Sequence, residues 1–346
     1  MNLSLFDFAG DLQFCYEFGN TSCIKSTFPS ITRTFMYMFM SGAILFTISG
    51  NIIVIIAIAH FRQLHTNTNC LVLSLAVVDF LLGCAVMPYS MLRSVEGCWY
   101  FGDLFCKIHT GTDIMLSTAS IFHLTFIAID RYYAVCDPLR YRMKITVGTV
   151  MSMIIISWVV PAIFAYALIF LELNIKGAVD IYYQHFTCMG DCTVFFSQGS
   201  SVVCSMFSFF IPGFIMLCIY GKIYHVAQQQ AKCINNTVNP FQETVKAPNV
   251  ISEIKERKAA KTLGTVMGVF LTCWSPFFFC TIIDPFLNYS VPPVLIDALV
   301  WFGYLNSTFN PLVYAFFYNW FRKSLKIIVS GKIFENGSAR SQLFLE

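Results

Sequence analysis

The stretch IHTGTDIMLSTASIFHLTFIAI, residues 108–129, has 22 residues and a single formally charged side chain, Asp113. A helix of this length spans the hydrocarbon core of a bilayer. A carboxylate at that depth costs a few kcal/mol unless it is paired or faces the protein interior. No Lys or Arg lies within any apolar segment to pair with it. We therefore expect Asp113 to face a cavity that receives a cation.

The composition of the whole chain is that of an integral membrane protein. Of its 346 residues, 57% are hydrophobic and only 12% are charged, whereas soluble domains contain about 25% charged residues. The mean hydropathy is +0.66. Seven apolar segments are long enough to span a bilayer, which predicts an all-α membrane protein with a seven-helix bundle. They cover residues 35–59, 70–92, 108–129, 145–171, 192–221, 262–283 and 298–321.

The basic residues set the predicted orientation. With the N-terminus outside, 17 of the 22 Lys and Arg residues fall on the cytoplasmic side, as the positive-inside rule requires. We expect an extracellular segment 1–34, a seven-transmembrane domain 35–318, and an amphipathic helix with a cytoplasmic tail over 319–346. Asn2 and Asn20 stand in glycosylation motifs on the outer side.

Six of the 14 cysteines fall on the outer side in this topology. An even number of cysteines in an oxidising compartment predicts three disulfides, although some of the six could instead be free. Many pairings are open to six cysteines, so the residues alone do not choose between them. The six are Cys15, Cys23, Cys98, Cys106, Cys188 and Cys192.

Asp113 is accompanied by side chains suited to an amine. Ser117 lies one turn along the same helix, and Tyr304 could donate a hydrogen bond that orients the carboxylate. A carboxylate beside aromatic faces binds an ammonium group through charge and cation–π attraction. Ordinary core packing is the alternative for any one of these rings. The rings at helical spacing are Trp274, Phe277, Phe278, Trp301 and Tyr304.

His109 and His123 lie in the same span as Asp113. Their separation along a helix is roughly 21 Å, which is too far for one metal ion. We interpret both as structural residues or residues at the rim of the pocket.

A second carboxylate, Asp79, lies in the second span among residues with amide and hydroxyl groups. Such hard oxygen ligands suit a sodium ion or water, and a polar network that ties helices together is the alternative. Sodium near Asp79 is the only metal we expect, and we expect no other cofactor. The remaining members are Asn51, Ser120, Asn306, Ser307 and Asn310.

The inner end of the third span carries Asp130-Arg131-Tyr132. An acid beside an arginine at this edge predicts a neutralised latch whose opening frees the guanidinium. Pro212, Pro276 and Pro311 interrupt the fifth, sixth and seventh spans, and kinks there could couple a ligand pocket to movement at the inner face.

These residues together resemble the rhodopsin-like G-protein-coupled receptors over nearly the whole chain. Asp113 with Trp274 and Tyr304 is similar to the aminergic branch, and Asn306–Phe321 fits the fingerprint of the trace amine-associated receptors throughout. Residues 98–102 and 342–346 resemble the phenethylamine and tyramine branch of that family. The wider motifs are Gly50-Asn51, Leu75–Asp79, Asp130–Tyr132, Trp158, Pro212, Cys273–Pro276 and Asn310–Tyr314.

The resemblance implies a receptor for small amines at the plasma membrane, with some of it retained inside the cell. It implies the stimulatory G protein as partner, rising cyclic AMP, contact with membrane lipid, and no nucleic acid. It implies roles in activation and G-protein coupling for the Asp130–Tyr132 motif and for Pro276, Asn310, Pro311 and Tyr314.

Particular contacts also follow from the resemblance. It implies a Cys106–Cys192 disulfide, with Cys15–Cys188 and Cys23–Cys98 as extra bridges to the N-terminus. It implies a short amphipathic helix after Tyr318. On the fifth helix, Cys204 stands where catechol receptors carry a hydroxyl, which favours phenethylamine-like ligands, with Ser208 in reach of a para-hydroxyl. Phe195 or Phe196 would form the lid.

Other functions remain as alternatives. An olfactory-type receptor for other volatile or tertiary amines has the same charge requirement. An amine transporter is more remote because we find no inverted repeat. A light sensor needs a lysine where Tyr304 stands. We expect no enzyme, because no nucleophile–base pair or metal cluster stands out.

Overall fold

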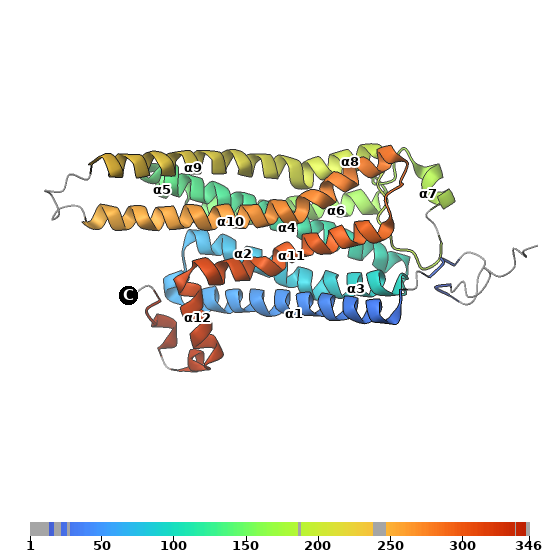
Figure 1. The fold of residues 1–346 in the computed structure, drawn as a ribbon, viewed down its shortest axis with the longest axis horizontal. Coiled ribbons are helices and arrows are strands. Elements are labelled where there is room, and N and C mark those ends of the chain that lie inside the picture. Colours follow the sequence, from blue (N-terminus) through green and yellow to red (C-terminus); the bar gives the residue numbers. More distant parts are fainter. Residues whose placement is uncertain are drawn as a thin grey trace, which may run out of the picture.

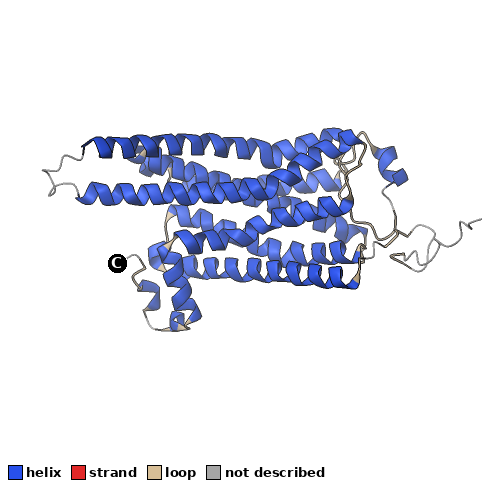
Figure 2. Cartoon of the chain, in the orientation of Figure 1, coloured by secondary structure: helices blue, strands red, loops and turns tan. Residues whose placement is uncertain are grey.

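The computed structural model describes residues 14–16, 22–25, 28–185, 188–237, 247–335 and 337–343. Regular structure in these residues is helical, and the extended contacts among them are two isolated bridges near the N-terminus (Figure 2). The long helices lie side by side as one elongated bundle (Figure 1).

The spans begin and end at turns that the sequence signals locally. Thr66 and Thr146 each accept a hydrogen bond from a backbone N–H in the first turn of the helix that follows. Gly97 ends α3 in the left-handed conformation, with φ of 65°. The spanning elements are α1 (Ser30–His60), α2 (Asn67–Leu81) with α3 (Met87–Glu96), α4 (Asp103–Cys136), α6 (Val147–Phe170), α8 (Gln198–Ser205) with α9 (Ile211–Thr237), α10 (Ala247–Ile283) and α11 (Pro293–Phe317).

Six of these are long and apolar enough to cross a membrane on length and composition, among the described residues. α11 is the seventh helix of the bundle and is not among the six. It carries Asn306, Ser307, Thr308 and Asn310, which lower its hydropathy, and all four are buried against other helices. Polar groups buried inside a bundle are shielded from lipid, so α11 is compatible with a spanning helix.

Several predicted boundaries differ from the helices. α10 begins at Ala247 rather than at residue 262, because its first turns are polar and so fell outside the apolar segment. The fifth span was expected from residue 192, but α8 begins at Gln198, because Cys192 is held in a disulfide and Ser197 caps the helix. The seventh was expected over 298–321, but α11 runs from Pro293 to Phe317 and the chain turns at Tyr318. The amphipathic helix α12 (Asn319–Val329) follows and lies across the inner end of α1 (Figure 1).

Two π-helical turns interrupt the spans, and the sequence pattern did not predict them. Leu82–Val86 joins α2 to α3, and Met206–Phe210 joins α8 to α9. Each ends two residues before a proline, Pro88 or Pro212. A proline has no N–H and its ring collides with the carbonyl four residues earlier, so the backbone widens there. Pro276 and Pro311 instead lie within continuous α10 and α11.

Three disulfides join the outer ends of the helices, and the pairing of two was predicted wrongly. Cys106–Cys192 is present, but the N-terminal bridges are Cys15–Cys98 and Cys23–Cys188 rather than the reverse. The backbone explains the exchange. Residues 22–24 pair with Phe14 on one side and Met189 on the other, and Cys23 donates its N–H to the Met189 carbonyl at 3.1 Å. Cys23 therefore lies beside Cys188.

Candidate functional site

The Asp113 carboxylate lies half-buried on α4 with a hydroxyl at each oxygen. The Tyr304 phenol donates to one oxygen at 2.6 Å, and the Ser117 hydroxyl donates to the other at 3.3 Å. Tyr304 is fully buried on α11, so the bond joins the third and seventh spans. Among the residues that the structure describes, no Lys, Arg or His forms an ion pair with Asp113. The site thus presents an oriented anion and no side-chain cation.

Ser90 on α3 also contacts Tyr304, and sequence reasoning missed it. Its hydroxyl lies 3.3 Å from the Tyr304 oxygen and 3.3 Å from His109 Nε2. Nε2 is also 3.2 Å from the Val86 carbonyl oxygen, which can only accept, so His109 carries its proton there. His109 therefore contacts the site indirectly: it bonds to Ser90, and Ser90 contacts Tyr304. Ser90 and Ser94 lie one turn apart on one face of α3, a spacing readable in the sequence, but that spacing does not say which neighbour the face meets.

Ser94 positions the Trp301 side chain through a hydrogen bond. The indole N–H donates to the Ser94 hydroxyl at 3.2 Å, and the ring meets Tyr304 edge-on at 5.5 Å. A turn earlier on α11, Asp297 pairs with Arg93 at 3.7 Å, and Arg93 also donates to the Cys192 carbonyl at 3.1 Å. Arg93 thus links α3 to α11 and to the Cys106–Cys192 disulfide.

The predicted aromatic wall is assembled on α10. Trp274 and Phe278 are buried, with ring centroids 5.7 Å apart, and Phe277 meets both rings edge-on. Phe278 stacks on Phe209 at 4.7 Å, which brings the fifth span into the same wall. Gly303, next to Tyr304, leaves room for the Trp274 indole: a Cβ there would lie 2.6 Å from a ring carbon.

Cys204 and Ser208, the fifth-span residues of the predicted site, are both buried. Ser208 accepts a hydrogen bond from Thr118 at 3.1 Å, so it is engaged within the bundle. Among the described serines of this span, Ser205 is the one whose buried hydroxyl has no hydrogen-bond partner. A buried hydroxyl in this state gains from a polar group brought by a ligand.

Phe195 and Phe196 lie on the loop before α8, as the lid prediction needs. Phe195 is buried between Tyr182 of α7 (Val179–His185) and Tyr289, with centroids 5.5 and 4.6 Å away. The Tyr289 phenol donates to the Phe196 carbonyl at 3.1 Å. Burial raises the pKa of Tyr289, so the phenol keeps the proton that it donates. The loop is thereby pinned to the segment between α10 and α11.

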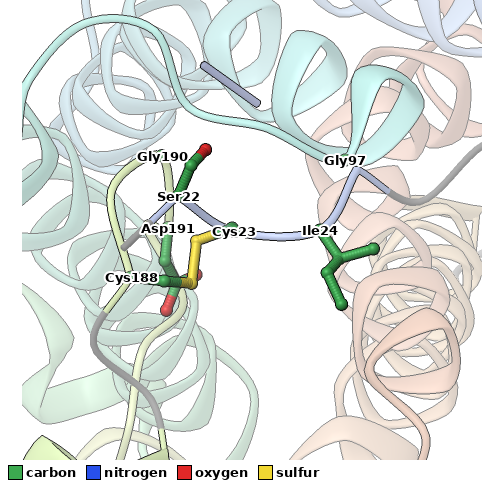
Figure 3. A pocket seen from close by; sticks show the side chains of 7 residues that line it. All are labelled: Ser22, Cys23, Ile24, Gly97, Cys188, Gly190 and Asp191. Atoms are coloured by element: carbon green, nitrogen blue, oxygen red, sulfur yellow. A yellow bond between two sulfur atoms is a disulfide. The ribbon is translucent and has the colours of Figure 1, made fainter. Parts of the chain in front are cut away.

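A separate pocket lies at the outer surface (Figure 3). It is formed where residues 22–24 cross between Gly97 and the loop that holds Cys188 and Asp191. The Cys23–Cys188 disulfide lies in its wall. It is lined by none of the residues around Asp113.

Three members of the predicted group around Asp79 contact its carboxylate directly. Asp79 is fully buried and accepts hydrogen bonds from Ser120, Ser307 and Asn310 at 3.0, 2.7 and 2.7 Å. The side-chain amide of Asn306 has no partner among the described residues. Asn51 is linked to this group through Ser307: its side-chain amide donates to the Ser307 backbone carbonyl at 3.1 Å. Hard oxygen donors and an unpartnered amide fit a small cation.

The inner-end motif forms a closed ion pair. Asp130 is fully buried and accepts from Arg131 Nε at 2.8 Å. Thr68 and Tyr141 also donate to this carboxylate, at 2.9 and 3.0 Å, and sequence reasoning named neither. Tyr132 turns its ring toward Lys222 on α9.

The glycosylation candidates Asn2 and Asn20 lie outside the described residues.

Comparison with known proteins agrees with this geometry. The family model of the seven-transmembrane receptors of the rhodopsin family matches residues 50–314. Trace amine-associated receptor 1 of Macaca mulatta is 62% identical over 97% of this chain and 99% of its own length. The human receptor 1 is 60% identical over the same shares. Trace amine-associated receptor 4 of Rattus norvegicus is 49% identical over 97% of this chain and 96% of its own.

A seven-helix bundle, a half-buried carboxylate oriented by a phenol, and likeness over almost the full length of these relatives lead to one conclusion. The chain is a multi-pass membrane receptor that belongs to the rhodopsin family of G-protein-coupled receptors and, within it, to the trace amine-associated receptors.

Proposed function

We propose that this receptor binds small primary amines of the phenethylamine and tyramine class and signals through the stimulatory G protein to raise cyclic AMP. The observation that carries the ligand class is the Asp113 carboxylate, which is oriented by Tyr304 and Ser117 and has no ion-pair partner among the described residues. The similarity to trace amine-associated receptor 1 supports the same reading.

The ligand pose follows from charge and size. The ammonium group pairs with Asp113, because an unpaired carboxylate in a partly buried site gains most from a cation. The ring of the amine then packs against the α10 wall of Trp274, Phe277 and Phe278. The lid formed by Phe195 and Phe196 closes above it.

The far end of the ligand faces the fifth span. Ser208 is already bonded to Thr118, whereas the Ser205 hydroxyl is free to pair. A para-hydroxyl, as in tyramine, would be recognised at Ser205. An unsubstituted ring would leave that hydroxyl unpaired.

Signalling requires that the bound state favour a different inner face. The amine contacts Trp274, which lies two residues before Pro276 on α10. A swing of α10 about this proline opens a cleft at the inner end. Arg131, freed from Asp130, and Tyr314 with the Asn310-Pro311 turn would line it. The ligand needs to supply only a few kcal/mol of differential affinity.

The deciding experiment is cyclic AMP production in cells that express the full chain, dosed with phenethylamine and tyramine. Asp113→Asn should remove the response at equal surface expression, because it deletes the charge with little change in shape. Asp103→Asn on the exposed first turn of α4 is the matched control and should respond as the parent does. A normal response in Asp113→Asn would refute the amine site.

Coupling is tested apart from binding. If a labelled amine binds in an Asp113-dependent way but cyclic AMP stays flat, the stimulatory coupling is wrong and the ligand class stands. A panel of tertiary and volatile amines in the same assay distinguishes the olfactory-type alternative.

We also propose that the receptor sits in the plasma membrane with its N-terminus outside. The excess of basic residues on the opposite side and the three disulfides at the N-terminal end support this orientation. An epitope placed before residue 14 should be stained on intact cells. Staining only after permeabilisation would contradict it.

We propose a sodium ion at Asp79, held with Ser120, Ser307, Asn306 and Asn310. A bound ion would stabilise the agonist-free receptor, since it binds one state and not the other. Replacing choline by sodium at constant ionic strength should raise the Tm of the purified receptor. The same change should have no effect in Asp79→Asn, and an equal rise in that variant would exclude the site.

A further inference from the structure

Residues 337–343 are packed against the rest of the molecule. After α12 the chain makes two short turns, η5 (Lys332–Phe334) and η6 (Ser338–Arg340), and comes back toward the inner ends of α1 and α2 (Figure 1). Leu343 is 0% exposed and belongs to the main apolar core with Phe61 and Leu64.

Two hydrogen bonds hold this segment to the first inner loop. The Leu343 backbone N–H donates to the Gln63 side-chain carbonyl at 3.0 Å. The Ser338 hydroxyl donates to the Ile333 carbonyl at 2.7 Å, and its oxygen lies 2.9 Å from His60 Nε2. Because the single hydroxyl proton is used on Ile333, His60 is the donor to Ser338. Residues more than 270 positions apart in sequence are thus joined at both ends of the segment.

The place of these contacts gives them a mechanical consequence. α12 continues from α11 through Tyr318, and Phe321 on α12 faces Tyr314 with ring centroids 6.5 Å apart. A displacement of the inner end of α11 therefore carries α12 with it. The docked segment connects the other end of α12 to the loop between α1 and α2, which resists that displacement.

We propose that residues 337–343 are a self-docking clamp that holds the agonist-free arrangement of α11 and α12. Its socket is the first inner loop with the end of α1, formed by His60, Phe61, Gln63 and Leu64. Its occupant is the receptor's own C-terminal segment, anchored by Leu343 and Ser338. Release of the segment frees α12 to follow α11 and uncovers the loop for a protein that binds the inner face.

Docking is tested by cross-linking in the full-length receptor in membranes. His60→Cys with Ser338→Cys should form a disulfide under mild oxidation, detected by mass spectrometry as one linked peptide pair. The control pair, His60→Cys with Phe334→Cys, uses a residue of the preceding turn η5 that is 91% exposed. The first pair should link at least about fivefold more than the control, as expected for a populated contact. Equal linking of the two pairs would overturn the docked arrangement.

The proposed restraint on α11 and α12 is tested by measuring agonist-free nucleotide exchange on a panel of heterotrimeric G proteins in the same membranes. Leu343→Asp places a charge in the apolar socket and should raise exchange roughly twofold or more per receptor. Gln342→Asp changes the exposed neighbour and should leave it unchanged. If Leu343→Asp does not reach the membrane, Gln63→Ala is compared with the parent instead. Cross-linking without a rise in exchange would overturn the clamp.

Discussion

At the scale of single residues, the site depends on hydroxyl groups that position other polar groups. Tyr304 holds Asp113, Ser90 contacts Tyr304, and Ser94 holds Trp301. Each lies in a buried setting where an unpaired partner costs more than the bond contributes. The carboxylate is therefore oriented before any ligand arrives, which lowers the entropy lost on binding.

This arrangement predicts the effect of removing one hydroxyl. Tyr304→Phe keeps the ring and its contact with Trp301 but deletes a hydrogen bond to a charged group, which contributes about 1.5–3 kcal/mol. The half-maximal concentration of phenethylamine for cyclic AMP should rise about tenfold or more. Tyr100→Phe, at a half-exposed tyrosine outside the bundle, is the control and should not differ from the parent. An unchanged potency in Tyr304→Phe would show that the carboxylate needs no orienting group.

The two hydroxyls of the fifth span give a second residue-scale prediction. Ser205→Ala should weaken the response to tyramine several-fold relative to phenethylamine, since only tyramine has a phenol to pair with it. Ser208→Ala removes the acceptor of Thr118 and should affect both amines alike. The ratio of the two half-maximal concentrations is the measurement. A tyramine-selective loss in Ser208→Ala, with none in Ser205→Ala, would reassign the role.

At the scale of helices, close packing at glycines positions the walls of the site. Gly303 faces the Trp274 ring, and Gly50 lets Pro311 approach α1. The two π turns before Pro88 and Pro212 shift the register of all residues that follow them, Ser90 and Ser94 on α3 among them. Side chains on these helices reach the site only with that shift in place.

Gly303→Ala tests the contact between α10 and α11. The new Cβ would lie 2.6 to 2.9 Å from three Trp274 carbons, so the ring or the helix must move. Overpacking of this kind costs about 1–3 kcal/mol. We expect a lower Tm of the purified receptor and altered agonist-free signalling. Gly42→Ala, where nothing lies within 4 Å, is the control, and equal effects of the two changes would contradict the packing argument.

At the scale of the whole molecule, the outer ends of the helices are joined covalently. The N-terminal residues 14–16 and 22–25 are bonded to the end of α3 and to the loop before α8. Glu96 adds ion pairs with Lys25 and Arg33. The end of the bundle that carries the N-terminal residues is thus a fixed frame, so a conformational change that leaves it intact must appear at the opposite end.

The two N-terminal disulfides should contribute unequally to the stability of the receptor. Cys15 and Cys98 are buried, whereas Cys188 is exposed, so replacing the buried pair by serine leaves polar groups without solvent. We expect Cys15→Ser with Cys98→Ser to lower the Tm of ligand-free receptor more than Cys23→Ser with Cys188→Ser. Both pairs would lose part of the about 2–4 kcal/mol that a disulfide contributes. A larger loss from the second pair would place the main restraint at Cys188.

The seven spans, the two buried acids and the aromatic faces could be predicted because each is a local property. Hydrophobic length, the position of a lone Asp113 and the spacing of Trp274 and Phe278 are readable along one helix. Ser90, Ser94 and Thr118 could not be identified, because a serine or threonine in a span has the same local pattern whether it faces a site or its own backbone.

The sequence by itself therefore predicted a seven-helix membrane receptor with a lone carboxylate inside its third span, since hydrophobic length and charge depend on the residues present. Only the tertiary structure decided which partners meet: Cys15 with Cys98, Ser208 with Thr118, and Leu343 with the first inner loop. These contacts join segments distant in sequence, and they depend on the rotation, register and end points of separate helices. No local pattern carries that information, because two helices with the same apolar face can pack in several registers.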